Sequence, residues 1–522
     1  MPLPETSDST RWPPPVDQDI HDVIRRWNAW YEGDRDKLEA VYDGGDVRRP
    51  THSRSGIAHT GGIVGVAHRL FWGQPVYEGQ QSTKLHVPAA ADIAQTSAEL
   101  LFSEPPALTL DTADTTAQGR IDELFGEQMW DRLLDAAALQ SGLGGVFLRA
   151  GWDRDRVADR PLMSVIGPDY ASPRFRWGKL TEVTFTWILP GETGQVVRYL
   201  EHHTVGAVEH GLYIGSGDKL GRRVPLDEHP ETAALAALVN SDSVVPTEIP
   251  MLTVVYVPNR TASAWRGDAV GGNLGQADIA VVERSGLLDA LDEAYSSWMR
   301  DVRLGKARAI TSQGYLQSSG PGRGSWFDMD QELFVAMNIP GKAGDQKPVE
   351  LIQAEVRWEA HQATCKAIFE RVVDGAGYSA QTFGLTGDVA ITATEVSARE
   401  RKTNRTRSGK ARDWSRAIPD LAELLLAIDQ KHLGGKVAPI RPNVEFPPMV
   451  RDTIETTART VSMLDGSMST AERVRLLHPT WDQEQIDQEV ADIADERSML
   501  TPIDPFAPTP DGDPGDGTDP AA

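Results

Sequence analysis

Residues 287–310 read LLDALDEAYSSWMRDVRLGKARAI, and this stretch decides the fold that we predict. Its apolar side chains recur at the i, i+3/i+4, i+7 spacing of an amphipathic helix, while Asp289, Asp292 and Asp301 fall on other faces. The apolar set comprises Leu287, Leu288, Leu291, Tyr295, Trp298, Met299 and Val302. We predict one continuous helix over residues 276–304, about 40 Å long at about 1.5 Å per residue.

A second long helix is predicted over residues 350–376, and it carries two adjacent apolar stripes. One stripe contains Val356, Ala360, Ala363 and Ala367, and the other contains Cys365, Ile368, Phe369 and Val372. Two such stripes on one helix indicate packing against more than one neighbour. The intervening residues 305–349 include strand-like runs and a Gly/Ser-rich turn, and a segment of this length favours a small folded module over a loop. The sequence therefore predicts a helical hairpin with a compact tip.

The patterns before this hairpin are helical at first and then strand-like. The helical segments cover residues 20–31, 38–42, 89–102 and 117–140. Between residues 145 and 260 the hydrophobic period changes to two, and Gly, Pro and Asp separate the runs, which predicts an antiparallel sheet with one helical insertion near 229–240. The fold class that we predict is α+β, mainly helical.

A third long helix follows the hairpin. It is predicted to begin near Thr392, to have a break or kink at Pro419, to reach about His432 and to end at Gly434. Residues 450–499 are also helical in pattern. The proline-rich ends of the chain, residues 1–19 and 500–522, are predicted to be a disordered leader and a disordered acidic tail.

Composition narrows the classes of function. The formal net charge is −24, from 52 basic and 76 acidic residues, which argues against a protein that wraps nucleic acid with a broad basic face. The single cysteine, Cys365, permits neither an internal disulfide nor a Cys-based zinc cluster. The chain start has no signal-peptide pattern and no stretch has the 18 or more apolar residues of a membrane span, so we expect a soluble, unexported protein.

The sequence contains no catalytic or cofactor signature, and we therefore expect neither an enzyme nor a cofactor. The Walker A pattern is absent, as are the nucleophile-elbow and Cys-His signatures. His202, His203 and His210 are residues of a type that binds metal ions. Neighbouring residues of a strand point to opposite faces, however, so His202 and His203 could not both ligate one ion. We interpret these three as hydrated strand histidines and predict no metal site.

Residues 399–416 form a basic segment within the acidic chain. The basic residues are Arg399, Arg401, Lys402, Arg405, Arg407, Lys410, Arg412 and Arg416, against only Glu400 and Asp413. On a helix, residues 401, 405, 412 and 416 share one face, while 399, 402 and 410 lie elsewhere. A solvated face, or salt bridges to acidic neighbours, is the favoured interpretation. Phosphate contact or pairing between subunits remains open as the alternative.

Several strings and their order resemble a bacteriophage portal protein of the stem-and-clip type, specifically the actinobacteriophage group similar to SPP1-like portals. The strings are WNAWYEGD (27–34), LHVPAAADIAQTSAELLFSEPP (85–106), LLDALDEAYSSWMRDVRLGKARAI (287–310), WFDMDQELF (326–334), AGYSAQTFGL (376–385) and TATEVSARERKT (392–403). The resemblance covers about residues 20–440. No single string is a catalytic signature, so its specificity lies in the combination and order.

The resemblance implies a portal fold with wing, stem, clip and crown. The implied parts are the wing (20–275), stem helix 1 (276–304), the clip (305–349), stem helix 2 (350–376), a channel loop (377–391), a long wing helix with a return strand (392–449) and a helical crown (450–499). The implied function is a ring, dodecameric in the family, at one capsid vertex, through which double-stranded DNA is packaged and ejected. A channel wall with net negative charge suits this role because it does not trap the duplex.

The resemblance also implies partners and candidate residues. The partners are other copies of the chain, double-stranded DNA, the terminase large subunit, a head-tail adaptor protein, and the major capsid and scaffold proteins, with no membrane. The location is the virion, and the host cytoplasm during assembly. The channel-loop candidates are Gln381, Thr382, Phe383, Leu385 and Asp388; the basic-helix candidates are Arg399, Arg401, Lys402, Arg405, Arg407 and Lys410; the clip candidates are Trp326, Phe327, Asp328 and Asp330.

Two rival interpretations remain. One is a capsid-associated structural adaptor or connector ring without a DNA-translocating role, which would lack the long helical hairpin. The other is a hydrolase that acts on packaging components, which the absence of any catalytic motif disfavours.

Overall fold

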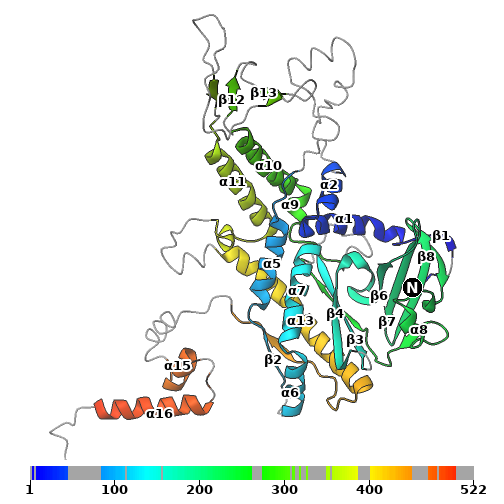
Figure 1. Ribbon diagram of the computed structural model, residues 1–522. Helices are drawn as coiled ribbons and strands as arrows, with labels where there is room; N and C mark the ends of the chain where they lie inside the picture. Colours follow the sequence, from blue (N-terminus) through cyan, green and yellow to red (C-terminus); the bar gives the residue numbers. More distant parts are fainter. Residues whose placement is uncertain are drawn as a thin grey trace, which may run out of the picture. The chain divides into compact units, whose positions relative to one another are not determined.

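The computed structural model describes fifteen stretches of the chain and divides it into two compact units. The described residues are 3–4, 7–44, 84–111, 114–154, 157–260, 273–305, 308–311, 317–318, 325–326, 349–352, 355–385, 400–448, 468–478, 481 and 483–500. The first unit is Met1–Pro447 and the second is Pro448–Ala522. The described helices and strands give a mixed α+β fold, as predicted (Figure 1).

The first unit begins with helices that the apolar pattern predicts well. They are α1 (Pro15–Glu32), α2 (Arg35–Gly44), α5 (Ala89–Phe102), α6 (Thr115–Leu124) and α7 (Glu127–Leu143). The single helix predicted over 117–140 is wrong, because the chain leaves the helical conformation at Phe125 and Gly126 and starts again at Glu127. Phe125 turns into the core at this break and packs against Trp130, with ring centroids 5.5 Å apart.

Two antiparallel sheets follow, as the period-two pattern predicts. The larger has the order β1-β9-β8-β7-β6-β5 with β10 on β8, and the smaller has the order β11-β3-β4. Their strands are β1 (Ser7–Arg11), β3 (Gly145–Asp153), β4 (Ala158–Ile166), β5 (Ala171–Arg176), β6 (Lys179–Leu189), β7 (Val196–Thr204), β8 (Ala207–Ser216), β9 (Lys219–Val224), β10 (Val244–Pro246) and β11 (Val254–Pro258). The predicted helical insertion contains α8 (Ala233–Ala236), only four residues long. Phe147 of β3 packs edge to face on Phe185 of β6 and joins the two sheets.

The prediction of a disordered leader is wrong for the part of it that the structure describes. Strand β1 pairs with β9, and α1 begins at Pro15. Leu3 and Trp12 are buried, and the Trp12 indole Nε1 donates a hydrogen bond to Thr186 Oγ1 at 2.8 Å. Proline content indicates only that this segment is not an interior helix, whereas two large apolar side chains provide the surface that attaches it to the sheet.

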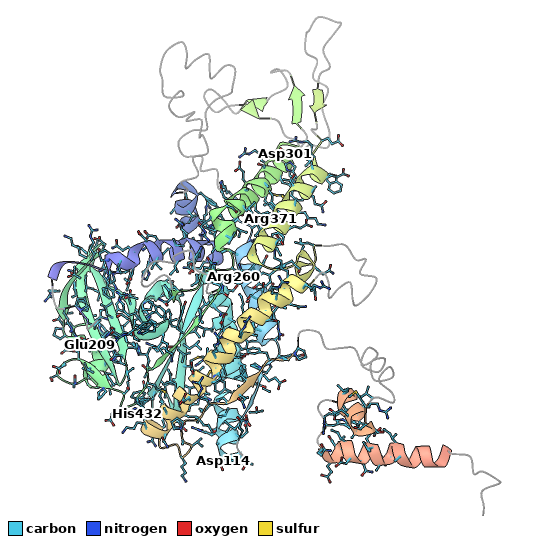
Figure 2. All side chains as sticks on the ribbon, turned by 180° about the vertical axis from the view of Figure 1, so that it is seen from behind. Asp114, Glu209, Arg260, Asp301, Arg371 and His432 are labelled. Carbon is cyan, nitrogen blue, oxygen red and sulfur yellow. The ribbon has the colours of Figure 1, made fainter. Side chains whose placement is uncertain are left out.

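The predicted helical hairpin is present as α10 (Leu287–Leu304) and α11 (Trp358–Ala376), which lie side by side in both views (Figures 1 and 2). The helix predicted to start at 276 instead starts at Leu287. A short helix, α9 (Ala280–Arg284), precedes it, and Gly286 adopts φ +73° between the two. A positive φ favours glycine and ends the α9 turn, so one continuous helix does not form.

The tip of the hairpin begins with a ladder of two short strands. Strand β12 (Arg308–Thr311) pairs antiparallel with β15 (Val349–Ile352), and β13 (Gln317–Ser318) pairs with β14 (Ser325–Trp326). The predicted start of the second stem helix, residue 350, is therefore wrong. Residues 350–352 belong to β15, and α11 begins six residues after Ile352, at Trp358. Val349, Leu351 and Ile352 are residue types that favour strands, which explains the shift.

The carboxyl-terminal part of the first unit consists mainly of one long helix. Helix α13 (Arg401–Ile428) continues into a π-helical turn (Asp429–Leu433) and ends at Gly434, as predicted. Pro419 lies inside α13, and of the predicted break or kink there the break is wrong, because the helix continues on both sides of it. The kink stays a prediction. The predicted start at Thr392 lies outside the described residues. A short strand, β16 (Asn443–Glu445), then pairs with β2 (Ala107–Thr109).

The second unit contains two described helices. They are α15 (Thr470–Leu477), whose Ser469 side chain caps the Glu472 N–H, and α16 (Gln483–Leu500). Helix α15 lies inside the segment predicted to be helical, 450–499, and α16 extends one residue beyond it, to Leu500. Residues 449–467 and residues 501–522 of the predicted tail, 500–522, lie outside the described residues. Across both units, no helix in the described stretches is both long enough and apolar enough to cross a membrane.

The three strand histidines are buried, so the prediction that they are hydrated is wrong. His203 contacts Thr253 Oγ1 at 2.7 Å and Glu201 Oε1 at 2.7 Å, and His210 contacts the Tyr199 hydroxyl at 2.6 Å. His202 points to the other face of β7, where its Nδ1 lies 2.9 Å from Thr184 Oγ1. The described residues hold no group of three His, Cys, Asp or Glu side chains arranged for a metal ion. Some of these partners lie close in sequence, such as Glu201 on the same strand, whereas Thr253 lies 50 residues from His203.

The burial of His202 predicts a pH dependence of stability. Burial lowers the pKa of His202 to about 4 from an ordinary value of 6.5. Between these values the unfolded chain binds more protons than the folded one, so the free energy of unfolding falls as pH decreases from about 6.5 to about 4. His202→Gln removes this titration, and the variant should lose about 1 kcal/mol less than the parent between pH 7 and pH 5, allowing for solvent screening. Guanidinium unfolding at both pH values measures it, and equal losses in the two proteins would contradict the assignment.

Candidate functional site

The predicted channel loop starts with a short segment that is fixed to the long helix. Gln381, Thr382 and Phe383 lie in a 3-10 turn, Ala380–Phe383, and Leu385 follows it; Asp388 lies outside the described residues. Thr403 of α13 accepts a hydrogen bond from the Ser379 N–H at 2.9 Å, and its hydroxyl lies 2.8 Å from that of Thr382. The described part of this segment, 378–385, is therefore attached to α13.

Aromatic packing holds the same segment on its other side. The Phe383 ring packs edge to face against Phe369 of α11 and Tyr378, with centroids 6.3 and 6.2 Å apart. Gly377 ends α11 with φ +98°, a left-handed backbone conformation that a residue with a side chain adopts only with strain. The chain therefore leaves the helical pair at a position that needs glycine.

A buried carboxylate lies where the helical pair, this segment and the long helix meet. Asp278, just before α9, is fully buried and accepts hydrogen bonds from Lys410 Nζ at 2.6 Å, Ser141 Oγ at 2.6 Å and Tyr378 Oη at 2.7 Å. The Asn259 side-chain amide donates to its second oxygen at 3.0 Å. We call this group the Asp278 cluster. It joins α7, the segment before α9, the end of α11 and α13.

The Asp278 cluster contains charges of both signs and is shielded from water. Lys410 is 4% exposed, and its Nζ also donates to Ser97 Oγ of α5 at 2.6 Å. Arg260 Nε lies 3.1 Å from Asp278 Oδ1, and its Nη2 donates to the Ala376 carbonyl. Two cations therefore face one carboxylate. A buried carboxylate is tolerated only when it is paired and its lone pairs are satisfied, and both conditions hold here.

The pKa values follow from this arrangement. Burial by itself would raise the pKa of Asp278, but Lys410 and Arg260 oppose it and lower the pKa to about 2. Burial lowers the pKa of Lys410, and Asp278 opposes that shift. Burial and then the Asp278 charge raise the pKa of Tyr378, whose hydroxyl keeps its proton and donates a hydrogen bond to the carboxylate. Asp278 therefore stays ionised near neutral pH, and the contacts of the group are those of a structural joint.

The structure separates the predicted basic helix into inward and outward cations. Lys402 pairs with Asp374, and Arg407 donates to the Leu100 and Pro447 carbonyls at 2.6 Å each. Lys410 belongs to the Asp278 cluster. Arg401, Arg405, Arg412 and Arg416 are all exposed, on the one face that the helical spacing predicts. Arg399 lies outside the described residues.

The clip candidates are for the most part beyond what the structure describes. Trp326 lies in β14, where its backbone pairs with Gln317. Phe327, Asp328 and Asp330 lie outside the described residues.

Sequence reasoning missed the centre of the Asp278 cluster. Asp278, Tyr378, Ser141 and Ser97 lie far apart in the chain and carry no local motif. One signal was available: Lys410 lies on the same side of α13 as the buried Trp414 and Leu421, opposite the exposed arginines. A lysine on an apolar helix face requires a buried anion.

The segment with this architecture matches a known family. Residues 277–502, which begin one residue before Asp278, match the family model described as "Phage portal protein, SPP1 Gp6-like". The matched segment contains the helical pair α10–α11, the 378–385 turn and α13, and it is less than half of the 522 residues. The resemblance to phage portal proteins is therefore confirmed over these residues.

Comparison with solved structures gives weaker likenesses. One is the neck of a native gene transfer agent (GTA) particle computed with C12 symmetry, 13% identical over 74% of this chain and 88% of that chain, with a TM-score of 0.35. A second is the neck of an empty GTA particle computed with C6 symmetry, 14% identical over 79% and 97%, with a TM-score of 0.36. No curated protein matches the chain. Because these TM-scores are low, the likeness to phage portal proteins depends on the family match alone.

Removal of the Lys410 ammonium tests the role of the Asp278 cluster. Lys410→Met leaves Asp278 buried with one cation fewer, and breaking a buried ion pair typically costs about 3–5 kcal/mol. We expect a loss of about 3 kcal/mol in the free energy of unfolding, measured by guanidinium denaturation. Arg412→Met on the exposed face of the same helix is the control and should change stability by less than about 0.5 kcal/mol. A Lys410→Met variant as stable as this control would show that the pair is not structural.

Proposed function

We propose that the chain is a portal subunit: copies form a ring at one vertex of a phage capsid, and double-stranded DNA passes through that ring during packaging and ejection. The observation that carries the proposal is the portal family match, which spans the helical pair, the 378–385 turn and α13. In this proposal α10 and α11 form the stem, the residues between them form the clip, and the chain leaving Leu385 faces the channel.

The charge of the chain supports a conduit. At a net charge of −24 per subunit, a ring repels a duplex, so DNA moves through it without a deep binding trap. Long-range repulsion of this kind is screened beyond about 10 Å at 0.1 M salt, so it acts mainly on DNA close to the wall. The role is mechanical and electrostatic, and we propose that the subunit acts without catalysis.

The second helix of the pair supports assembly into a ring. Its stripe of Cys365, Ile368, Phe369 and Val372 faces the interior of the subunit, with Cys365 and Val372 buried. Ala360, Ala363 and Ala367 of the other stripe remain exposed. Across the pair, Asp301 of α10 accepts hydrogen bonds from His361 at 2.8 Å and Arg357 at 3.1 Å. One side of α11 is therefore occupied by its own subunit, and the other is free to pack against an adjacent copy.

The partners that we propose follow from the portal role. The terminase large subunit docks at the clip during packaging, a head-tail adaptor protein replaces it, and major capsid and scaffold proteins contact the wing. The protein is located in the virion, and in the host cytoplasm during assembly.

Electron microscopy of the purified protein tests the proposal, and Ala363→Glu sharpens the test. The parent protein should form rings with a central hole in axial views, whereas a buried charge at Ala363 should abolish them because a desolvated carboxylate lacks a partner. Gln362→Glu places the same charge one residue away and is the matched control, which should still form rings. A parent protein that stays monomeric at every concentration would contradict the proposed function.

A further inference from the structure

The outward arginines of α13 form a stripe of positive charge. Arg401, Arg405, Arg412 and Arg416 are exposed, and the first three have no ion pair or hydrogen bond within the described stretches. Arg416 has only a long contact with Asp413, 3.8 Å between Nη1 and Oδ1. Between the arginines, Thr406 and Gly409 line a surface hollow of about 480 Å³. Small residues at these positions leave room for side chains from a partner.

Helix α7 carries a complementary stripe of negative charge. Glu127, Asp131 and Asp135 follow each other at i, i+4 and i+8, all three are exposed, and none has an ion pair or hydrogen bond to another described residue. Two exposed cations lie on or beside α7 and hydrogen-bond to neutral groups: Arg132 of α7 donates to the Met163 carbonyl at 2.9 Å, and Arg160 donates to Gln128 Oε1 of α7 at 3.0 Å. The three carboxylates of the acidic stripe therefore have no ion-pair partner within these parts of the subunit.

The two stripes lie on opposite sides of the subunit. The Trp414 indole of α13 donates to Gln140 Oε1 of α7 at 2.9 Å, and this bond joins the two helices. Asp131 lies nine residues before Gln140, and Arg405 lies nine residues before Trp414, which in each helix is two and a half turns. Each stripe therefore points directly away from the other helix. The figures agree, because α7 is nearer the viewer in Figure 1 and α13 is nearer in Figure 2.

The central part of the arginine stripe matches the acidic stripe in length. At about 1.5 Å per residue, Arg405 and Arg412 are about 10 Å apart along their helix, and Glu127 and Asp135 are about 12 Å apart along theirs. The whole arginine stripe, from Arg401 to Arg416, extends over about 22 Å. A closed ring of identical subunits needs two different, complementary faces on each subunit. Opposite charge and opposite placement are the properties that such a head-to-tail contact requires.

We propose that the arginine stripe of α13 docks on the acidic stripe of α7 of an adjacent copy of this chain and so orients the ring contact. This proposal rests on the proposed function. A second copy is favoured over DNA as the occupant because the chain itself displays the matching anionic stripe on its opposite face, and because each subunit repels DNA overall. Exposed pairs add little affinity one by one, but complementary stripes raise the association rate and exclude wrong orientations.

Charge reversal in the full-length protein tests the contact. Arg405→Glu with Arg412→Glu makes both faces acidic, and Glu127→Lys with Asp131→Lys makes both faces basic. Each double variant alone should lose at least tenfold in ring yield at about 0.1 M salt, where repulsion between like faces still acts. An equimolar mixture of the two should recover mixed rings, because acidic-faced and basic-faced subunits then alternate. One chain with all four changes should recover rings by itself.

Ring yield is measured by electron microscopy and native mass spectrometry, with thermal melting to confirm that each variant folds. Lys219→Glu with Arg222→Glu, two exposed cations on β9, is the matched control for the change in net charge and should form rings normally. Normal rings from the separate stripe variants, or no recovery in the mixture, would overturn the proposal while leaving the proposed function intact. Parent rings in which the α13 arginines remain free to bind duplex DNA would overturn it in favour of the nucleic-acid alternative. A parent protein without rings would instead contradict the proposed function.

Discussion

One buried ion pair, between Asp278 and Lys410, connects the parts of the first unit that the proposed conduit needs to keep in register. Its carboxylate is reached from α7, from the end of α11 and from α13, and its ammonium also reaches α5. The helical pair, the turn at 378–385 and the long helix therefore meet at one point. Because an unpaired charge there would be costly, these elements are expected to keep their relative positions or to separate together.

The cations of the chain have distinct tasks. Lys410, Lys402 and Arg407 are tied to buried or backbone acceptors, whereas Arg401, Arg405 and Arg412 are left at the surface of the same helix. One helix thus provides both the internal joint and an outward charged stripe, at positions half a turn of the helix apart. In a chain with a net charge of −24, outward arginines on one face are a local exception, and an acidic helix on the opposite face complements them.

Much of the fold could be predicted from local pattern, and the failures have common physical causes. The 3.6-residue period identifies α1, α5, α10 and α13, and the period of two identifies both sheets. The predicted helix boundary is wrong at Gly286, where a positive φ separates α9 from α10. It is also wrong at residues 350–352, which pair as a strand with β12. The exposed face of α13 was predictable, because helical spacing depends on the sequence alone. Asp278 was not, because its partners lie in segments up to about 140 residues away, and only the fold brings them together.

The central claim is that this chain is a ring subunit in which the α10–α11 pair surrounds a central opening. A cryo-electron microscopy reconstruction of the assembled particle tests it most directly, because the register of these helices identifies them in a map. The account predicts that the pairs from successive subunits lie around the axis, with the chain leaving Leu385 directed to the channel. A reconstruction in which the pair lies on the outer rim, away from any central opening, would contradict it.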